Sequence, residues 1–158
     1  MELNGVEILL VEDNTDDVEL IRRALKKHGL TNKLYAVRDG VEAIDFLFST
    51  GAFSAQKIKD GLKLILLDLK LPRADGLVVL RKIKSDKRTK TIPVVVLTSS
   101  HQERDLVESY NLGANSYIVK PVEFNKFTQT VSDVVLYWLS LNKPPVKHVK
   151  TTINHNRD

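Results

Sequence analysis

Three short, uninterrupted apolar runs constrain the fold of this 158-residue chain more than any other feature. They lie at Ile8–Val11, Leu64–Leu67 and residues 94–97. Because these runs are continuous rather than alternating, they are typical of strands that are buried on both faces of a parallel sheet. Weaker runs at Leu34–Val37 and Ser116–Val119 predict two further strands.

Helical patterns fall between and after these strands. We expect five helices, at residues 16–29, after Asp39, at Gly76–Ser85, after Ser100 and at residues 123–141. A strand followed by a helix, repeated five times, predicts a doubly wound α/β fold, in which helices cover both faces of a parallel sheet. The longer loop at residues 50–61 is interpreted as a surface excursion without chemistry.

Local signals support the ends and faces of these helices. Capping-box patterns, Asp39-x-x-Glu42 and Ser100-x-x-Glu103, predict the starts of the second and fourth helices, and Gly29 is a candidate C-cap for the first. The spacing of the apolar residues predicts which side chains face the sheet. In the third helix these are Leu77, Leu80 and Ile83, and in the fifth they are Phe124, Phe127, Val131, Val134, Val135 and Trp138.

Polar residues follow the predicted strands at the points where the strands end. Glu12 and Asp13 come after the first strand, Asp68 after the third, Thr98 after the fourth and Lys120 after the fifth. In open α/β sheets, ligands bind outside the carboxyl ends of the strands. The sequence therefore predicts that these side chains converge on one site.

The residue types at this site indicate phosphoryl chemistry. Three clustered carboxylates require a cation, and oxygen ligands without His or Cys favour Mg²⁺ or Mn²⁺. Lys120 and the hydroxyl of Thr98 are suited to phosphoryl oxygens, and an Asp carboxylate can itself form an aspartyl-phosphate. Taken singly, each residue could equally be a helix cap or a turn residue. Their joint placement at the ends of four strands favours the functional interpretation.

The residues around these positions resemble the receiver domain of two-component response regulators across residues 6–141. The matching segments are Ile8-Leu9-Leu10-Val11-Glu12-Asp13, Leu66-Leu67-Asp68-Leu69-Lys70-Leu71-Pro72 with Asp75-Gly76, Val96-Leu97-Thr98 and Tyr117-Ile118-Val119-Lys120-Pro121. Further segments are similar to the small regulators that partner bacterial phytochromes. These are Asp45-Phe46-Leu47, Ser109-Tyr110, Asn115-Ser116-Tyr117, Tyr137-Trp138-Leu139 and Pro144-Pro145.

The resemblance implies a role for each matching residue. Asp68 would be the phosphoacceptor, and Asp13 and Asp68 would bind Mg²⁺ directly. Glu12 would act on the metal through water, and the backbone carbonyl of Lys70 would complete the metal shell. Thr98 and Lys120 would contact the phosphoryl group, and Tyr117 would be the switch aromatic that reports the movement of Thr98. The resemblance also implies the strand order 2-1-3-4-5 and a cis bond between Lys120 and Pro121.

Two positions stand out within this resemblance. Glu12 replaces the Asp that is found in many receivers, and its longer side chain is expected to alter the water-mediated metal shell. Lys70 places a cation two residues after the acceptor, and we hypothesise that it affects the rate at which the phosphoryl group is lost to water.

Composition narrows the cellular setting. The chain has no cysteine, its first eleven residues do not read as a signal peptide, and its apolar runs are too short to span a membrane. We therefore expect a soluble, cytoplasmic protein.

The net charge is +4, of which residues 143–158 contribute +3. A second basic cluster, which comprises Arg81, Lys82, Lys84, Lys87, Arg88 and Lys90, is interpreted as a solvated helix end and loop, so no direct contact with nucleic acid is expected.

The chain leaves little room for a separate output domain. We expect a receiver domain at residues 1–145 and a flexible basic tail at 146–158, so the signal would pass through the receiver's own surface. Leu136 and Tyr137 lie off the main apolar stripe of the last helix and form a candidate interface. We favour a homodimer through the fourth and fifth helices, and the alternative is that the tail around Pro144 and Pro145 folds back over this surface.

Three other function classes were weighed. A phosphatase or phosphotransferase with an Asp nucleophile would place a second Asp two residues after the nucleophile, where this chain has Lys70. A nucleotide-binding module would need a Gly-rich phosphate loop, and none follows the first predicted strand. A DNA-binding protein would need a recognition element, and none is left once the five strand-helix units are assigned. The sequence instead predicts a phosphorylation switch with at most autodephosphorylation activity. The resemblance implies that its partner is a sensor histidine kinase, with a bacteriophytochrome as the candidate.

Overall fold

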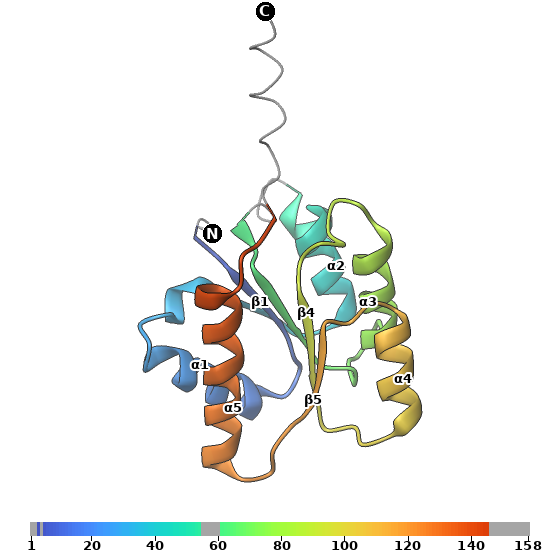
Figure 1. The fold of residues 1–158 in the computed structure, drawn as a ribbon. Coiled ribbons are helices and arrows are strands. Elements are labelled where there is room, and N and C mark those ends of the chain that lie inside the picture. The colour runs from blue at the N-terminus through green and yellow to red at the C-terminus, as the bar shows by residue number, and fades with distance from the viewer. Residues whose placement is uncertain (1–2, 4, 55–60, 146–158) are drawn as a thin grey trace, which may run out of the picture.

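The computed structural model describes residue 3, residues 5–54 and residues 61–145. Its centre is a parallel sheet of five strands in the order β2-β1-β3-β4-β5. The strands are β1 (Ile8–Val11), β2 (Leu34–Val37), β3 (Leu64–Leu67), β4 (Val94–Thr98) and β5 (Ser116–Val119). The predicted strands and their order are confirmed (Figure 1).

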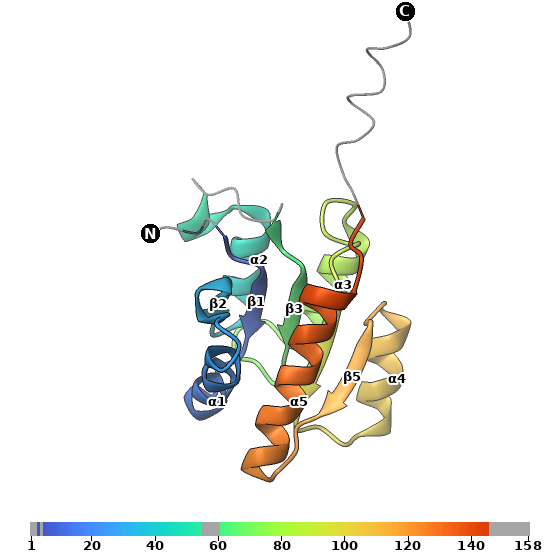
Figure 2. The same ribbon diagram turned by 60° about the vertical axis from the view of Figure 1, so that its left-hand side comes forward.

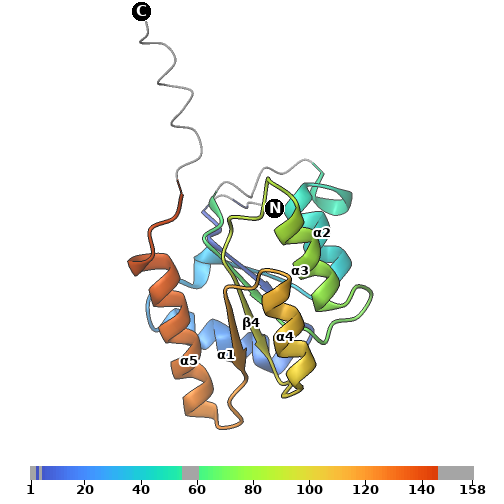
Figure 3. The ribbon, with the colours of Figure 1, turned by 45° about the vertical axis from the view of Figure 1, so that its right-hand side comes forward.

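Helices cover both faces of this sheet, as the doubly wound fold requires. Their bounds are α1 (Thr15–Lys26), α2 (Gly40–Phe48), α3 (Gly76–Ser85), α4 (Glu103–Asn111) and α5 (Phe124–Leu136). Short 3-10 helices occur at η1 (Thr31–Lys33) and η2 (Gly51–Phe53), and a π-helical turn, η4 (Tyr137–Leu141), extends α5. Helices α1 and α5 pack side by side on one face (Figure 2), and α2, α3 and α4 lie on the other (Figure 3).

The core has two layers because successive side chains of each strand point to opposite faces of the sheet. Leu9 and Val11 belong to the layer under α2 and α3, whereas Ile8 and Leu10 belong to the layer under α1 and α5. All four side chains are almost fully buried. This double burial is the physical reason for the continuous apolar runs. Within the described residues, no helix is long and apolar enough to cross a membrane.

The helix starts follow the predicted signals in one case and depart from them in another. At α2 the Asp39 side chain accepts from the backbone N–H of Glu42 at 2.8 Å, as expected of an N-cap. The predicted capping box at Ser100 is wrong. Helix α4 begins at Glu103 after Gln102, and the Ser100 hydroxyl instead donates to Asp105 at 2.6 Å.

Two predictions of exposure and burial are corrected by the packing. The loop after Thr50 is not only a surface excursion, because Phe53 is buried against Tyr35 and Phe46, with ring centroids 5.8 and 5.2 Å away. Phe124 was expected to face the sheet but is 49% exposed, since it is the first residue of α5. The sheet-facing stripe of α5 begins at Phe127 instead.

Candidate functional site

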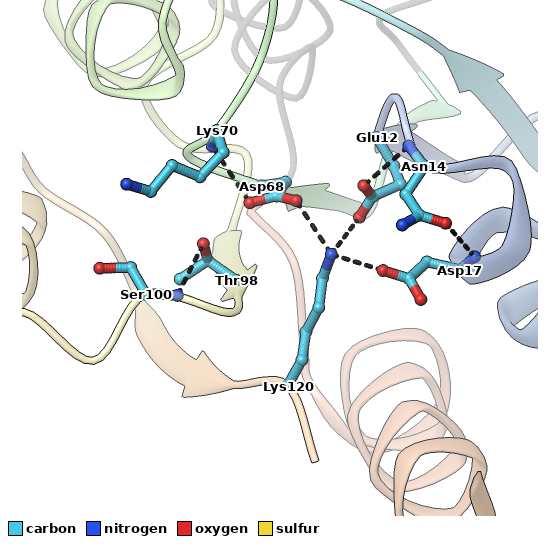
Figure 4. Close-up of polar contacts among 8 residues, drawn as sticks. All are labelled: Glu12, Asn14, Asp17, Asp68, Lys70, Thr98, Ser100 and Lys120. Carbon is cyan, nitrogen blue, oxygen red and sulfur yellow. Dashed lines mark hydrogen bonds and ion pairs between the residues drawn. The ribbon is translucent and has the colours of Figure 1, made fainter. Parts of the chain in front are cut away.

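The predicted polar residues meet at the carboxyl edge of the sheet. Strands β1 and β3 end in register, with Val11 beside Leu67, so the residues that follow them are neighbours. Strands β4 and β5 likewise end together, with Thr98 beside Val119. The parallel register therefore brings Glu12, Asp13, Asp68, Thr98 and Lys120 to one place, as the sequence predicted (Figure 4 shows all of these except Asp13).

The ammonium group of Lys120 lies at the centre of this site. Its Nζ is 2.8 Å from Oε1 of Glu12, 2.7 Å from Oδ2 of Asp17 and 2.9 Å from Oδ2 of Asp68 (Figure 4). The side chains of Lys120, Glu12 and Asp68 are only 10%, 2% and 6% exposed. Charge-assisted hydrogen bonds of this length in a partly dry setting are strong. They fix the position of the lysine at the end of β5.

Burial is the main cause of a shifted pKa at Glu12. Burial, followed by the nearby Asp68 carboxylate, raises the pKa of Glu12 from 4.5 to about 7, although Lys120 opposes the shift. Burial by itself would lower the pKa of Lys120, but the bonds from Asp17, Glu12 and Asp68 outweigh burial and raise it. The site therefore holds more negative charge than its single lysine balances.

Three of the carboxylates fit a divalent cation. Ligand oxygens of Glu12, Asp13 and Asp68 all lie within 4.8 Å of one another. The donors are all oxygens, which suit hard cations. Burial and then the neighbouring Asp68 carboxylate raise the pKa of Glu12, and a cation bound beside these carboxylates would offset their charge. Asp13 is exposed to solvent, so the cluster is open on one side.

Lys70 approaches the site through its backbone. Its N–H donates to Oδ1 of Asp68 at 3.2 Å, which places both Asp68 oxygens in hydrogen bonds. The exposed Lys70 side chain leads away from the carboxylates (Figure 4). Its main chain, rather than its charge, is therefore what the fold holds against Asp68.

Thr98 is linked to a network on the other side of the site. Its side chain is fully buried, and its Oγ1 accepts from the backbone N–H of Ser100 at 3.4 Å. The Tyr117 hydroxyl donates to the backbone carbonyl of Ser100 at 3.2 Å. Burial is the main reason why the pKa of Tyr117 is raised. Thr98 and Tyr117 therefore meet at the same residue of the loop between β4 and α4.

The structure adds two residues that sequence reasoning missed. Asp17 in the first turn of α1 binds Lys120, and the backbone N–H of Asn14 donates to Oε2 of Glu12 at 3.1 Å. Asn14 is also the N-cap of α1, because its side chain accepts from the N–H of Asp17. The pattern Asn14-x-x-Asp17 directly after the acidic pair was the available signal. Acidic residues are common in a first helical turn, however, so it did not stand out.

One expectation at this site is wrong. The bond between Lys120 and Pro121 is trans, as are all peptide bonds among the described residues. The cis form was implied only by the resemblance. For a bond that precedes proline, trans is favoured by about 0.5–1 kcal/mol unless the surroundings demand cis.

Known proteins are similar to this chain in sequence. Among curated relatives, the chain is 41% identical to the probable methanogenesis regulatory protein FilR2 of Methanothrix harundinacea over 87% of this chain and 86% of that protein. It is 40% identical to the response regulator Rcp1 of Synechocystis over 84% of this chain and 88% of that protein.

Solved structures of response regulators are also similar to this chain. The phosphorylated cyanobacterial phytochrome response regulator RcpA matches with a TM-score of 0.83 and 41% identity, over 90% of this chain and 99% of that one. The Mn²⁺-bound form of Rcp1 matches with a TM-score of 0.82 and 38% identity, over 89% of this chain and 99% of that one.

A family model agrees with these relatives. The model of the response regulator receiver domain matches residues 8–132, which include every strand and the residues that surround Lys120. The match spans well over half of the chain. The strand order, the acidic site at the carboxyl edge and the relatives all lead to one conclusion: the chain belongs to the response regulator receiver domain family.

Proposed function

We propose that this receiver takes a phosphoryl group onto Asp68 from a histidine kinase in a Mg²⁺-dependent reaction and then signals through its own surface. The observation that supports this most directly is the setting of the Asp68 carboxylate. It is 5% exposed, 2.9 Å from the Lys120 ammonium and part of the three-carboxylate cluster. A carboxylate held between a cation and a metal site is suited to become an aspartyl-phosphate.

Each predicted residue has a place in this proposal. Asp13 and Asp68 would hold Mg²⁺ directly, Glu12 through water, and the backbone carbonyl of Lys70 would complete the set. When bound, Mg²⁺ supplies positive charge that offsets the charge of the transferring group. Lys120 and Thr98 would contact the phosphoryl oxygens, and Tyr117 would respond through its contact with the β4–α4 loop.

The step itself is a displacement at phosphorus. An oxygen of Asp68 forms the new O–P bond while the N–P bond of a phosphohistidine breaks, and the released imidazole nitrogen keeps the bonding electron pair. The residues of this chain position the acceptor and stabilise charge, and they form no covalent bond other than that of Asp68. Lys120, whose pKa is raised and which therefore stays charged, is suited to this role.

Turnover chemistry has less support. An enzyme with an Asp nucleophile would need an acid close to it, but the residue two positions on is Lys70, whose side chain leads away from the site (Figure 4). We infer a switch with at most autodephosphorylation activity. An exchange with a histidine kinase that uses ATP would take place in the cytoplasm.

The partner is proposed from the similarity to RcpA and Rcp1. Because RcpA is a phytochrome response regulator, we propose a bacteriophytochrome-type histidine kinase as the phosphoryl donor. The test uses such a kinase after autophosphorylation with labelled ATP and follows transfer of label to the wild-type chain, Asp68→Asn and Asp75→Asn. Asp75 is an exposed carboxylate seven residues further on that caps α3, and Asn is an equally good cap.

We expect label on wild type and on Asp75→Asn, and none on Asp68→Asn. Label on Asp68→Asn at the wild-type level would contradict the assignment of the acceptor. Transfer that fails with phytochrome-type kinases but succeeds with another histidine kinase would reject only the proposed partner.

We also propose a homodimer through α4 and α5. Exposed apolar side chains occur on α4, at Leu106, Val107 and Tyr110, and in the turn η4 that extends α5, at Tyr137 and Leu141. Tyr137 is 48% exposed, whereas Leu136 is partly buried, so Tyr137 is the better interface candidate. Pro144 and Pro145 are exposed, and residues 146–158 of the proposed tail lie outside the described residues.

Sedimentation velocity with and without beryllofluoride tests the dimer. We expect Tyr137→Ser to weaken dimerisation and Val41→Ser, a comparable exposed apolar site on α2, to leave it unchanged. A monomer at every micromolar concentration in both states would reject the dimer and leave the phosphorylation proposal intact.

The basic cluster around α3 supports the proposal that nucleic acid is not a direct partner. Lys82 and Arg88 lie 5.2 and 4.8 Å from the ring centroid of Phe48, and Arg88 also pairs with Asp86 at 2.8 Å. Lys84 donates to the backbone carbonyls of Lys90 and Ile92, in the segment between α3 and β4. These basic side chains already make contacts within the folded chain. A mobility-shift assay with duplex DNA at physiological salt would test whether the protein binds DNA directly.

A further inference from the structure

Asp17 has a place in the site that the metal cluster does not explain. It lies in the first turn of α1, and its oxygen is 2.7 Å from Nζ of Lys120, the shortest of the three contacts to that ammonium. The two residues are 103 positions apart in sequence. Asp17 is not one of the three carboxylates whose oxygens lie within 4.8 Å of one another.

Three carboxylates occupy the ammonium group of Lys120. An ammonium group has three N–H bonds; Asp17 and Asp68 each accept a hydrogen bond from it, and an oxygen of Glu12 pairs with it at 2.8 Å (Figure 4). A phosphoryl group on Asp68 that contacts Lys120 must therefore take a donor from one of these carboxylates. Of the three, Asp17 alone is neither the acceptor nor a member of the metal cluster. Its negative charge therefore stays beside the site both before and after Asp68 is phosphorylated.

We propose that Asp17 is a positioning residue that holds Lys120 and, as a fixed negative charge, strengthens cation binding while it weakens binding of the phosphoryl anion. This inference rests on the proposed phosphorylation of Asp68. The site as a whole carries four carboxylates, those of Glu12, Asp13, Asp17 and Asp68, against the one ammonium of Lys120. Loss of one carboxylate charge therefore acts on a cation and on an anion with opposite signs.

This opposition of signs distinguishes the proposed role from a merely structural one. A residue that only keeps the site folded would, when altered, weaken both ligands. Asp17→Asn keeps a side-chain oxygen that can accept from Lys120 and removes only the charge. We expect the Mg²⁺ dissociation constant to rise about tenfold and the beryllofluoride dissociation constant, measured at saturating Mg²⁺, to fall by a similar factor.

Asp16→Asn is the matched control. Asp16 is the neighbouring residue in the same first turn and carries the same charge, so the two variants change the net charge and the α1 dipole alike. Asp16 is exposed, whereas Asp17 is one-fifth exposed and in contact with Lys120. Isothermal titration of each protein with Mg²⁺ alone, and then with beryllofluoride, gives both constants without any need for turnover. Asp17→Ser serves as a second variant, with the same expected signs.

Opposite shifts in Asp17→Asn and Asp17→Ser, with constants for Asp16→Asn close to those of wild type, would support the proposal. Equal shifts in Asp16→Asn and Asp17→Asn would overturn it, because the effect would then be one of overall charge. Weaker binding of both ligands would also overturn it. If wild type itself bound neither ligand, the proposed function would fail, and the role of Asp17 would fail with it.

Discussion

Arg73 binds Asp39 through two parallel hydrogen bonds, with Nε 2.9 Å from Oδ2 and Nη2 3.1 Å from Oδ1. This ion pair joins the loop after β3 to the first turn of α2. The backbone N–H of Gly40 donates to the carbonyl of Pro72 at 3.4 Å and adds a second link. The loop that carries Lys70 past Asp68 is therefore held by α2 as well as by its own strand.

The Arg73–Asp39 pair is expected to contribute modestly to stability. Arg73 is 59% exposed, so solvent screens the pair, and a double-mutant cycle should give a small favourable coupling. The suitable variants are Arg73→Asn, because Arg73 has a positive φ of 66° that Asn tolerates, and Asp39→Asn, which keeps the N-cap. Urea unfolding measures the four free energies, and a coupling near zero would contradict the expectation.

Gly40 should not accept a side chain. A Cβ at this position would overlap the backbone carbonyl and the side chain of Ala74, and neither can rotate away. Gly40→Ala must therefore displace the loop between β3 and α3, and we expect a loss of about 1–3 kcal/mol in the free energy of unfolding together with weaker Mg²⁺ binding. Wild-type values for both quantities in urea unfolding and metal titration would show that the loop does not rest on α2.

Phe53 is expected to stabilise the fold despite its position in a loop. It is 3% exposed and packs edge-on against Phe46, which in turn stacks on Tyr35 with centroids 5.0 Å apart. Removing a buried aromatic ring leaves a cavity, so Phe53→Ala should lower the free energy of unfolding by about 3–5 kcal/mol. A change below about 1 kcal/mol in urea unfolding would restore the interpretation of this loop as a surface excursion.

Without metal, stability should fall as pH rises toward neutrality because of Glu12. Its folded-state pKa is raised from 4.5 to about 7, chiefly by burial and then by Asp68. Between these values the folded chain binds more protons than the unfolded chain, so the contribution of Glu12 is complete below pH 4.5 and is lost as pH passes 7.

The measurement is the free energy of unfolding of wild type minus that of Glu12→Gln, in EDTA, across this pH range. Gln mimics the protonated side chain, so the difference should decrease as pH rises. A difference that increases with pH would refute the raised pKa. Added Mg²⁺ should stabilise wild type more at high pH than at low pH, since the metal and the proton compete for the same charge.

Much of this structure follows from the sequence for identifiable reasons. The strands β1, β2, β3 and β5 have the predicted bounds. Their sequences are either apolar on both faces of the strand or bounded by residues that form turns. The meeting of Asp68 and Lys120 was predictable as well, since parallel strands bring their carboxyl ends to one edge.

The sequence failed where short side chains had several possible partners. Ser100 could cap a helix, but its hydroxyl donates to Asp105 and accepts from the N–H of Gln102, so the predicted box does not form. Asp17 resembled an ordinary acidic residue in a first helical turn, and only the packing of α1 beside α5, the helix that follows Lys120, brings it to that lysine. Phe53 was hidden in a polar loop, where one aromatic residue shows no periodicity.

Intact mass after incubation with acetyl phosphate and Mg²⁺ tests the central claim most directly. Wild type and Asp75→Asn should each gain about 80 Da, the mass of one phosphoryl group, whereas Asp68→Asn should gain nothing. EDTA should abolish the gain in wild type. An adduct on Asp68→Asn, or an undiminished adduct in EDTA, would contradict a Mg²⁺-dependent acceptor at Asp68.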